Sequence, residues 1–264
     1  ATELSAGSVT LTLSSTNNGN CNQVTDNLVI NFTPAPVVNA GLDKNICKNN
    51  ASTALSGTVS GGSTTGIWSG GSGTFSPSSS ALTTTYTPTA AELSAGSVNL
   101  VLTSTGNGNC SAVTDNILII FTNAPTVNAG LDIASCKNNA ATILSGIVSG
   151  TTTTGIWAGG TGTFTPNNTA LNATYNPSAA DLTAGTVTLT LTSTSNANCN
   201  AVTDNMVINF TPSPVVNAGL NINTCKNSPS TPLSGIVLGG TTTGIWSGGL
   251  GSFNPSNSVL NATY

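Results

Sequence analysis

The sequence predicts an all-β protein built as a tandem array of immunoglobulin-like β-sandwich repeats. The segment Thr64–Gly71 returns almost unchanged as Thr153–Gly160 and again as Thr242–Gly249. The step between copies is 89 residues each time, and it carries one tryptophan per copy. A fixed period of this kind is the signature of a repeat architecture. The period is close to the size of an immunoglobulin-like domain, roughly 100 residues.

Proline-containing segments mark the joints between the predicted repeats. Pro34-Ala35-Pro36 has counterparts in Asn123-Ala124-Pro125 and Pro212-Ser213-Pro214. Proline fixes its own φ and restricts the preceding residue, so these segments predict stiff junctions. They divide the chain into the C-terminal half of one repeat, two complete repeats and the N-terminal half of a further repeat: 1–34, 35–123, 124–212 and 213–264.

Short alternating segments predict the strands of each repeat. Apolar residues alternate with polar ones in Ser8–Leu13 and again in Val24–Phe32, around an Asn/Gly-rich turn, which indicates a hairpin. About seven short strands with turn signals between them favour a sandwich. In the first complete repeat we expect strands over 37–43, 54–59, 66–69, 73–75, 81–87, 97–103 and 113–121, with one helical turn over 89–93.

The composition excludes several classes of function. Only 5% of the residues are charged, the net charge is −4, and neither His nor Arg occurs. Binding to nucleic acid or to an anionic membrane needs clustered basic residues, so neither partner is expected. Without His, no Ser-His-Asp or Cys-His site can form. The few acids are expected in turns and helix caps, the pair Glu92 and Asp115 included, so we expect no enzyme activity.

Six cysteines keep the same period and predict disulfides in an oxidising compartment. Bridged Cα atoms lie within about 7 Å, and pairing inside one repeat needs no reversal of the chain. This predicts Cys47–Cys110 and Cys136–Cys199, with Cys21 and Cys225 paired outside this segment. The alternative joins neighbours across the junctions: Cys21–Cys47, Cys110–Cys136 and Cys199–Cys225.

The aromatic and acidic residues of each copy suggest two kinds of site. Trp68, Trp157 and Trp246 fit a core position beside the disulfide, together with Tyr86 and Tyr175. The alternative is that the indoles are exposed and stack on sugars. Asp43 and Asp132 follow a junction and are candidate calcium ligands, because calcium takes carboxylate and carbonyl oxygens. No cofactor is required by either interpretation.

The order of motifs resembles a known family of repeats. Val38-Asn39-Ala40-Gly41-Leu42-Asp43 is followed by Cys47, by Leu55-Ser56-Gly57, by the tryptophan, by Tyr86-Thr87-Pro88, by Gly96–Leu100 and by Asn109-Cys110 with Thr114-Asp115. This series is similar to the PKD-like, immunoglobulin-like repeats of very large surface proteins of Bacteroidota, among them gliding-motility adhesins. The resemblance implies a β-sandwich array, display on the cell surface, and an adhesive or filamentous role without catalytic residues.

The sequence therefore predicts a structural or adhesive segment of a long extracellular fibre or stalk at the cell surface. Its partners are expected to be other repeats of the same protein, identical copies, surface glycans or other cells. Two alternatives stay open. The half-repeats 1–34 and 213–264 complete each other between copies in a self-assembling filament, or the array binds carbohydrate through exposed tryptophans. No stretch is apolar for long enough to span a membrane.

Overall fold

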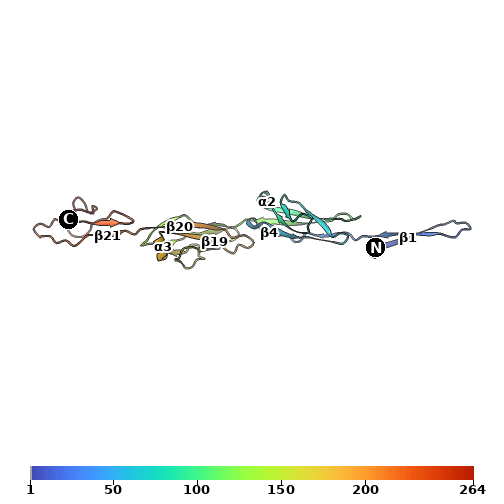
Figure 1. Ribbon diagram of the computed structural model, residues 1–264, viewed down its shortest axis with the longest axis horizontal. Coiled ribbons are helices and arrows are strands. Elements are labelled where there is room, and N and C mark those ends of the chain that lie inside the picture. The colour runs from blue at the N-terminus through green and yellow to red at the C-terminus, as the bar shows by residue number, and fades with distance from the viewer. Residues whose placement is uncertain (1) are drawn as a thin grey trace. The chain divides into compact units, whose positions relative to one another are not determined.

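The computed structural model describes residues 2–264 and consists mainly of strands, with the short helices α2 and α3 beside them (Figure 1). The all-β prediction is therefore confirmed. Two compact units are present. The first comprises the chain up to Ala124 together with Asn198–Asn200, and the second comprises Pro125–Ala197 and Ala201–Tyr264. Within residues 2–264, no helix combines the length and the apolar character needed to cross a membrane.

In the first unit, the repeat of residues 35–123 contains a four-stranded sheet, a three-stranded sheet and a separate two-stranded pair. The four-stranded sheet has the order β4-β11-β10-β7, the three-stranded sheet the order β5-β9-β8, and β3 pairs with β6. The elements are β3 (Val37–Asn39), β4 (Lys44–Cys47), β5 (Thr53–Ser56), β6 (Thr58–Ser60), β7 (Thr65–Ser69), β8 (Thr74–Ser76), β9 (Thr83–Thr87), α2 (Ala90–Ala95), β10 (Ser97–Thr105) and β11 (Thr114–Thr122).

Alternation of apolar residues explains why β10 and β11 form the centre of this sheet. Successive strand residues point to opposite faces, so every second side chain is buried. Leu100 and Leu102 of β10 and Ile117 and Ile119 of β11 all face the core, while their neighbours are more exposed. Their partner β7 places Trp68 directly opposite Leu102. The hydrophobic pattern thus fixes the register of the three strands.

In the second unit, the repeat of residues 124–212 has the same topology. Its sheets have the orders β13-β20-β19-β16 and β14-β18-β17, and β12 pairs with β15. The elements are β12 (Thr126–Asn128), β13 (Ile133–Cys136), β14 (Thr142–Ile143), β15 (Ile147–Ser149), β16 (Gly155–Ala158), β17 (Thr163–Thr165), β18 (Thr174–Asn176), α3 (Ala179–Ala184), β19 (Thr186–Ser193) and β20 (Thr203–Thr211). Trp157 and Tyr175 are fully buried in its core.

The two incomplete copies form only part of these sheets. At the N-terminal end, α1 (Thr2–Ala6) precedes a hairpin of β1 (Ser8–Ser14) and β2 (Thr25–Asn31). At the C-terminal end, β21 (Val215–Asn217) pairs with β22 (Ile236–Leu238). The segment 243–247, which matches β7, is not a strand. It lacks the β10 equivalent that gives β7 its hydrogen bonds.

Helices α2 and α3 confirm the helical turn that the sequence predicts. Thr89 accepts a hydrogen bond from the backbone N–H of Glu92, and the Glu92 side chain accepts one from the backbone N–H of Thr89. Ser178 and Asp181 form the same capping box in the next repeat. Each helix ends at a glycine with positive φ, as αL caps require. This short turn therefore begins and ends at residues encoded in every complete repeat.

Two strand predictions are wrong in detail: the expected strand 37–43 ends at Asn39, and the expected strand 54–59 is broken at Gly57. The break at Gly57 has a clear physical reason. The first part of the broken strand, β5, pairs with β9, and its second part, β6, pairs with β3. A Cβ atom at Gly57 would lie 2.4 Å from Leu102 Cδ2 and 2.8 Å from Trp68 Cζ2. The strand changes sheets where the backbone passes over the indole, and only glycine fits there.

We expect Gly57→Val to destabilise the first repeat by about 1–3 kcal/mol, because the new side chain would overlap buried core atoms. Ser56→Val is the matched control, since Ser56 is exposed on the same stretch of chain. It should change the unfolding free energy by less than about 0.5 kcal/mol. Hydrogen exchange of the β10 and β11 amides measures both effects. Equal protection in the two variants would contradict the close packing at Gly57.

Candidate functional site

The candidate site is a disulfide between cysteines that belong to successive repeats. Cys47, at the end of β4, is bonded to Cys199, which lies in the loop between β19 and β20. Their Cα atoms are 5.0 Å apart and their sequence separation is 152. Residues Asn198–Asn200 are part of the first compact unit, although the strands on either side belong to the second. The bond therefore links two repeats covalently.

This finding corrects the predicted pairing. Cys47 is not bonded to Cys110, and Cys136 is not bonded to Cys199; the alternative pairing across adjacent junctions is not formed either. Strand β4 runs parallel to β11 and sets Cys47 opposite Thr122 at the end of that strand. Cys110 precedes its start. A nine-residue strand is about 30 Å long, so two cysteines of one repeat lie too far apart to bond.

Side-chain amides surround the disulfide. Asn49 donates a hydrogen bond to the carbonyl of Asn200 at 3.0 Å and accepts one from its backbone N–H at 3.0 Å. Asn200 also donates to the carbonyl of Asn49 at 2.7 Å. Asn50 donates to the carbonyl of Asn198, and Asn198 donates to the carbonyl of Asn45, both at 3.2 Å. These neutral contacts are insensitive to pH and salt, which suits an exposed structural joint.

The same cysteine environments recur where no disulfide is formed. The thiol of Cys110 lies 3.7 Å from the carbonyl oxygen of Pro34, as Cys199 Sγ lies 3.8 Å from that of Asn123. Cys136 pairs with the end of β20 as Cys47 pairs with the end of β11. In the part of the chain that the structure describes, Cys21, Cys110, Cys136 and Cys225 are free.

The residues around the disulfide belong to two motifs that recur in the sequence. The Cys-Lys-Asn motif recurs at Cys47, Cys136 and Cys225, and an Asn-Cys motif recurs at Cys21, Cys110 and Cys199. In the structure, the first motif supplies Asn49, which accepts from Asn200 N beside the second motif, and the second motif supplies Asn198, which donates to the carbonyl of Asn45. These two amide-rich motifs, each present once per period, are the sequence signal for the joint.

The tryptophans of the complete repeats lie in the core. Trp68 is 2% exposed and Trp157 is fully buried, and each indole N–H donates to a backbone carbonyl, of Leu82 and Leu171 respectively. Tyr86 and Tyr175 are buried as well. Trp246 differs from the core position that the sequence predicts, because it is only partly buried in a copy without the central hairpin.

Asp43 and Asp132, the candidate calcium ligands, act as acceptors for backbone amides. Asp43 accepts from Leu118 N and Asp132 from Val207 N, each at 2.8 Å. Among residues 2–264, no three His, Cys, Asp or Glu side chains gather in one place. Both aspartates therefore tie the chain after the junction to the central strand β11 or β20. Calcium at these positions stays a prediction.

A buried carboxylate forms a polar cluster in each complete repeat. Glu92 accepts hydrogen bonds from Tyr86 Oη at 2.6 Å, from Ser72 N at 2.7 Å and from Thr89 N at 2.8 Å. Burial alone would raise the pKa of Glu92, but these hydrogen bonds outweigh it and hold the pKa below its usual value. Burial, reinforced by the bond to Glu92, raises the pKa of Tyr86 to about 12.

The second repeat places an aspartate in the same position. Asp181 accepts from Tyr175 Oη at 2.7 Å, Ser178 N at 2.9 Å and Thr161 N at 3.0 Å. Burial opposes ionisation of Asp181, yet these donors hold its pKa well below the usual range. Burial and the bond to Asp181 also raise the pKa of Tyr175 to about 12. In both repeats the acid connects the helix cap to the core. Its carboxylate oxygens accept hydrogen bonds from groups of the same repeat.

We expect Glu92→Gln to lower the free energy of unfolding of the first repeat by about 1–3 kcal/mol at neutral pH, because charged hydrogen bonds are replaced by neutral ones. Since the folded pKa of Glu92 is lowered, its contribution is present above the ordinary carboxyl pKa and disappears as the pH falls through the folded pKa. The difference between wild type and variant should therefore shrink in acid.

The control is Glu3→Gln, since Glu3 is the exposed counterpart of Glu92 in the N-terminal half-repeat. It should shift the unfolding free energy of the first repeat by less than about 0.5 kcal/mol. Thermal unfolding at several pH values measures both variants. A Glu92→Gln effect that is the same at every pH would contradict the role given to the charge.

Comparisons with known proteins find remote similarity to solved structures. No family model matches this chain, and no curated protein matches it. The three-immunoglobulin structure of titin domains I67–I69 is 11% identical, with a TM-score of 0.45, over 88% of this chain and 87% of that one. Cadherin domains 1–4 of protocadherin gamma B7 are 12% identical, with a TM-score of 0.39, over 97% and 74%. Drosophila N-cadherin EC1–4 is 12% identical, with a TM-score of 0.36, over 70% and 52%.

This chain is a tandem array of immunoglobulin-like β-sandwich repeats. The sheets of the chain itself show this. The two complete repeats have the same strand order, the same register and the same buried tryptophan. At identities and TM-scores this low, the similar structures add nothing about ligands or activity. The features that bear on function are therefore the Cys47–Cys199 disulfide and the cores of the two complete repeats.

Proposed function

We propose that this chain is a non-catalytic, load-bearing and adhesive segment of an extracellular fibre or stalk at the cell surface. The observation that carries the proposal is the Cys47–Cys199 disulfide, which ties one repeat to the next. A protein held together in this way needs an oxidising compartment, because cytosolic thiols are kept reduced. Its covalent link resists extension of the chain across 152 positions.

The surface chemistry supports the same role. The chain has four basic and eight acidic residues among 264, so its polarity comes from Ser, Thr and Asn. Such a surface keeps its character as salt and pH change outside a cell. The buried acids Glu92 and Asp181 accept hydrogen bonds from groups of their own repeats, and these bonds stabilise the fold. The resemblance of the repeat motifs to those of Bacteroidota adhesins supports display on a bacterial surface.

Immunogold labelling of intact cells of the source organism tests the proposal. Antibodies raised against residues 35–212 should decorate projecting material without permeabilisation, and treatment of intact cells with protease should remove the label. Label that appears only after permeabilisation would contradict an extracellular role. A cytoplasmic protein of similar abundance serves as the control for leakage.

A carbohydrate-binding array is not favoured by the structure. Sugar stacking needs an accessible indole face, and Trp68 and Trp157 are enclosed by their cores. Trp246 alone is partly exposed. It stands where the central hairpin would cover it in a complete repeat, so its exposure is explained by the missing half of that repeat.

A further inference from the structure

The disulfide joint contains one side chain that touches both of the segments it connects. The Oδ1 atom of Asn49 accepts a hydrogen bond from the backbone N–H of Asn200 at 3.0 Å and lies 3.1 Å from Cys47 Sγ. Its Nδ2 atom donates to the carbonyl of Asn200 at 3.0 Å. Asn49 is partly buried and Cys47 is fully buried. One amide therefore fixes the place of Cys47 relative to the residue that follows Cys199.

Polar contacts hold the residues on both sides of Cys199. Asn200 donates through its side chain to the carbonyl of Asn49 at 2.7 Å. Asn198 donates through its side chain to the carbonyl of Asn45 at 3.2 Å. This turn belongs to the same compact unit as strand β4. None of these bonds involves a sulfur atom, so they can form before the disulfide does.

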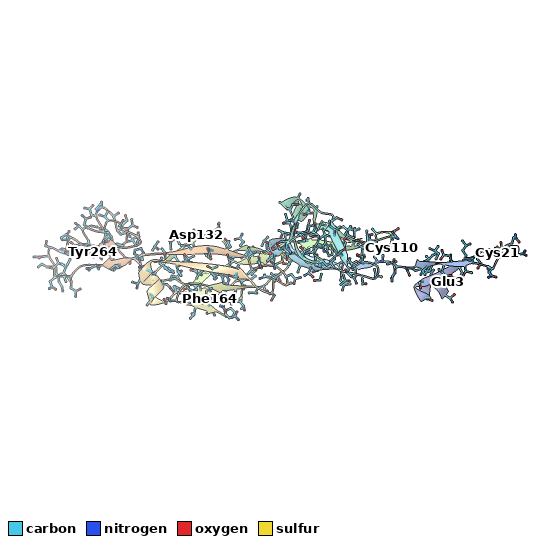
Figure 2. All side chains as sticks on the ribbon, turned by 45° about the vertical axis from the view of Figure 1, so that its right-hand side comes forward. Glu3, Cys21, Cys110, Asp132, Phe164 and Tyr264 are labelled. Atoms are coloured by element: carbon cyan, nitrogen blue, oxygen red, sulfur yellow. A yellow bond between two sulfur atoms is a disulfide. The ribbon has the colours of Figure 1, made fainter. Side chains whose placement is uncertain are left out.

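The turn between β10 and β11, which contains Cys110 (Figure 2), provides a natural comparison with the turn between β19 and β20. Each turn is closed by the same hydrogen bond, because Asn107 and Asn196 donate to the backbone carbonyl three residues earlier, both at 3.1 Å. The residue after the cysteine differs: it is Ser111 in the first turn and Asn200 in the second. The hydroxyl of serine is one bond closer to the backbone than the amide nitrogen of asparagine, so Ser111 cannot replace the contact that Asn200 makes.

We propose that Asn49 and Asn200 are positioning residues that select the pairing of Cys47 with Cys199 when the chain is oxidised. Their amides hold the two thiols side by side before the bond forms, and the residue after the second cysteine decides how well its turn fits. The inference rests on the load-bearing joint proposed above and deepens it, because it names the residues that assemble the joint. It can fail while that role stands, since a disulfide can form without help from its neighbours.

Selection matters because the reduced chain contains six thiols in similar surroundings. Each Cys-Lys-Asn segment has the same residues at and after its cysteine, whereas the other three cysteines are followed by Asn22, Ser111 and Asn200. Thiol–disulfide exchange lets the pairs rearrange until the most stable ones dominate. A contact that favours one pair therefore raises the share of that pair among the products.

The bond forms in two exchange steps with a disulfide oxidant such as oxidised glutathione. One cysteine thiolate attacks the oxidant, forms a mixed disulfide and releases one glutathione thiolate. The other cysteine thiolate then attacks the sulfur of the first and releases the second glutathione. Overall, two protein thiols lose two protons and two electrons, and one oxidised glutathione becomes two thiols. Asn49 and Asn200 act on the second step, because its extent depends on the effective concentration of one cysteine at the other.

Equilibration of the whole chain in glutathione redox buffers, followed by acid quenching and peptide mapping without reduction, measures this effective concentration. Asn200→Ser installs the residue of the Cys110 turn and should lower it about 2- to 10-fold, the effect of one hydrogen bond. Asn49→Ala removes two hydrogen bonds and should lower it about 5- to 100-fold. Asn138→Ala is the matched control, since Asn138 has the same place beside Cys136, which is free in the described chain. It should change the value by less than about twofold.

Hydrogen exchange of the reduced variants separates positioning from a general loss of structure. The β10 and β11 amides should keep wild-type protection in Asn49→Ala and Asn200→Ser, because the lost bonds lie outside the core. An unchanged effective concentration in both variants, an equal fall in Asn138→Ala, or a fall matched by lost protection would overturn the proposal. In each of these cases a wild-type map that contains Cys47–Cys199 leaves the fibre role intact, whereas a wild-type map without this pair contradicts both.

Discussion

Trp157→Ala is expected to lower the free energy of unfolding of the second repeat by roughly 3–5 kcal/mol. The indole is fully buried against Leu189 and Leu191 of β19, and it donates to the carbonyl of Leu171 at 3.2 Å. Alanine would leave a cavity, while the carbonyl of Leu171 would keep its hydrogen bond from Gly146 N at 3.0 Å. Because a small domain is stable by about 5–15 kcal/mol, this loss removes a large part of the total. Hydrogen exchange of the β19 and β20 amides measures it.

Trp246→Ala is the matched control for this prediction. It removes the same side chain from the equivalent position in the half-repeat, where the indole is partly exposed and segment 243–247 is not a strand. Under reducing, monomeric conditions, we expect protection of β19 and β20 to change by less than about 0.5 kcal/mol. A comparable loss of protection in both variants would contradict the view that each complete repeat has a core of its own.

Loss of the Cys47–Cys199 bond is expected to be the other large effect. A cross-link over 152 positions restricts the unfolded chain, and the chain-entropy model gives roughly 5 kcal/mol for a loop of this length. Cys47→Ser and reduction of the wild type should therefore lower the guanidinium midpoint by the same amount. Guanidinium titration followed by tryptophan emission measures the shift.

The free cysteines provide controls for this experiment. Cys110→Ser and Cys136→Ser remove thiols that are not bonded in the structure, so their midpoints should match that of the wild type at low protein concentration. Once reductant is present, Cys47→Ser should add little further loss. A stronger effect of Cys110→Ser than of Cys47→Ser would favour pairing inside one repeat and contradict the assignment made here.

Much of the fold follows from local sequence. Alternation in Ser97–Thr103 predicts the central hairpin, because buried and exposed side chains must alternate on a strand. One tryptophan in each repeat, always preceded by Ile, predicts the place of Trp68 in the core. Thr89 with Glu92 predicts the short helix through a capping box. Each of these features depends on residues that are close in sequence.

Other features depend on topology and were not predictable in the same way. The break at Gly57 reflects close passage over Trp68, and nothing near Gly57 in sequence encodes it. The disulfide depends on the parallel pairing of β4 with β11, which carries Cys47 away from Cys110. It also depends on a loop from the next repeat. Local patterns predict which residues form strands. The cysteine that pairs with Cys47 can be identified only when the arrangement of the strands in the sheet is known.

Force spectroscopy on the whole chain, pulled from its two ends, tests the load-bearing role most directly. With the disulfide intact, residues between Cys47 and Cys199 are bypassed, and their length cannot be extended. At about 3.3–3.6 Å per residue, reduction should release on the order of 500 Å of additional contour length, in steps that mark the unfolding of the two complete repeats. Equal extension of the oxidised and reduced chains would contradict a covalent link between repeats and the load-bearing role built on it.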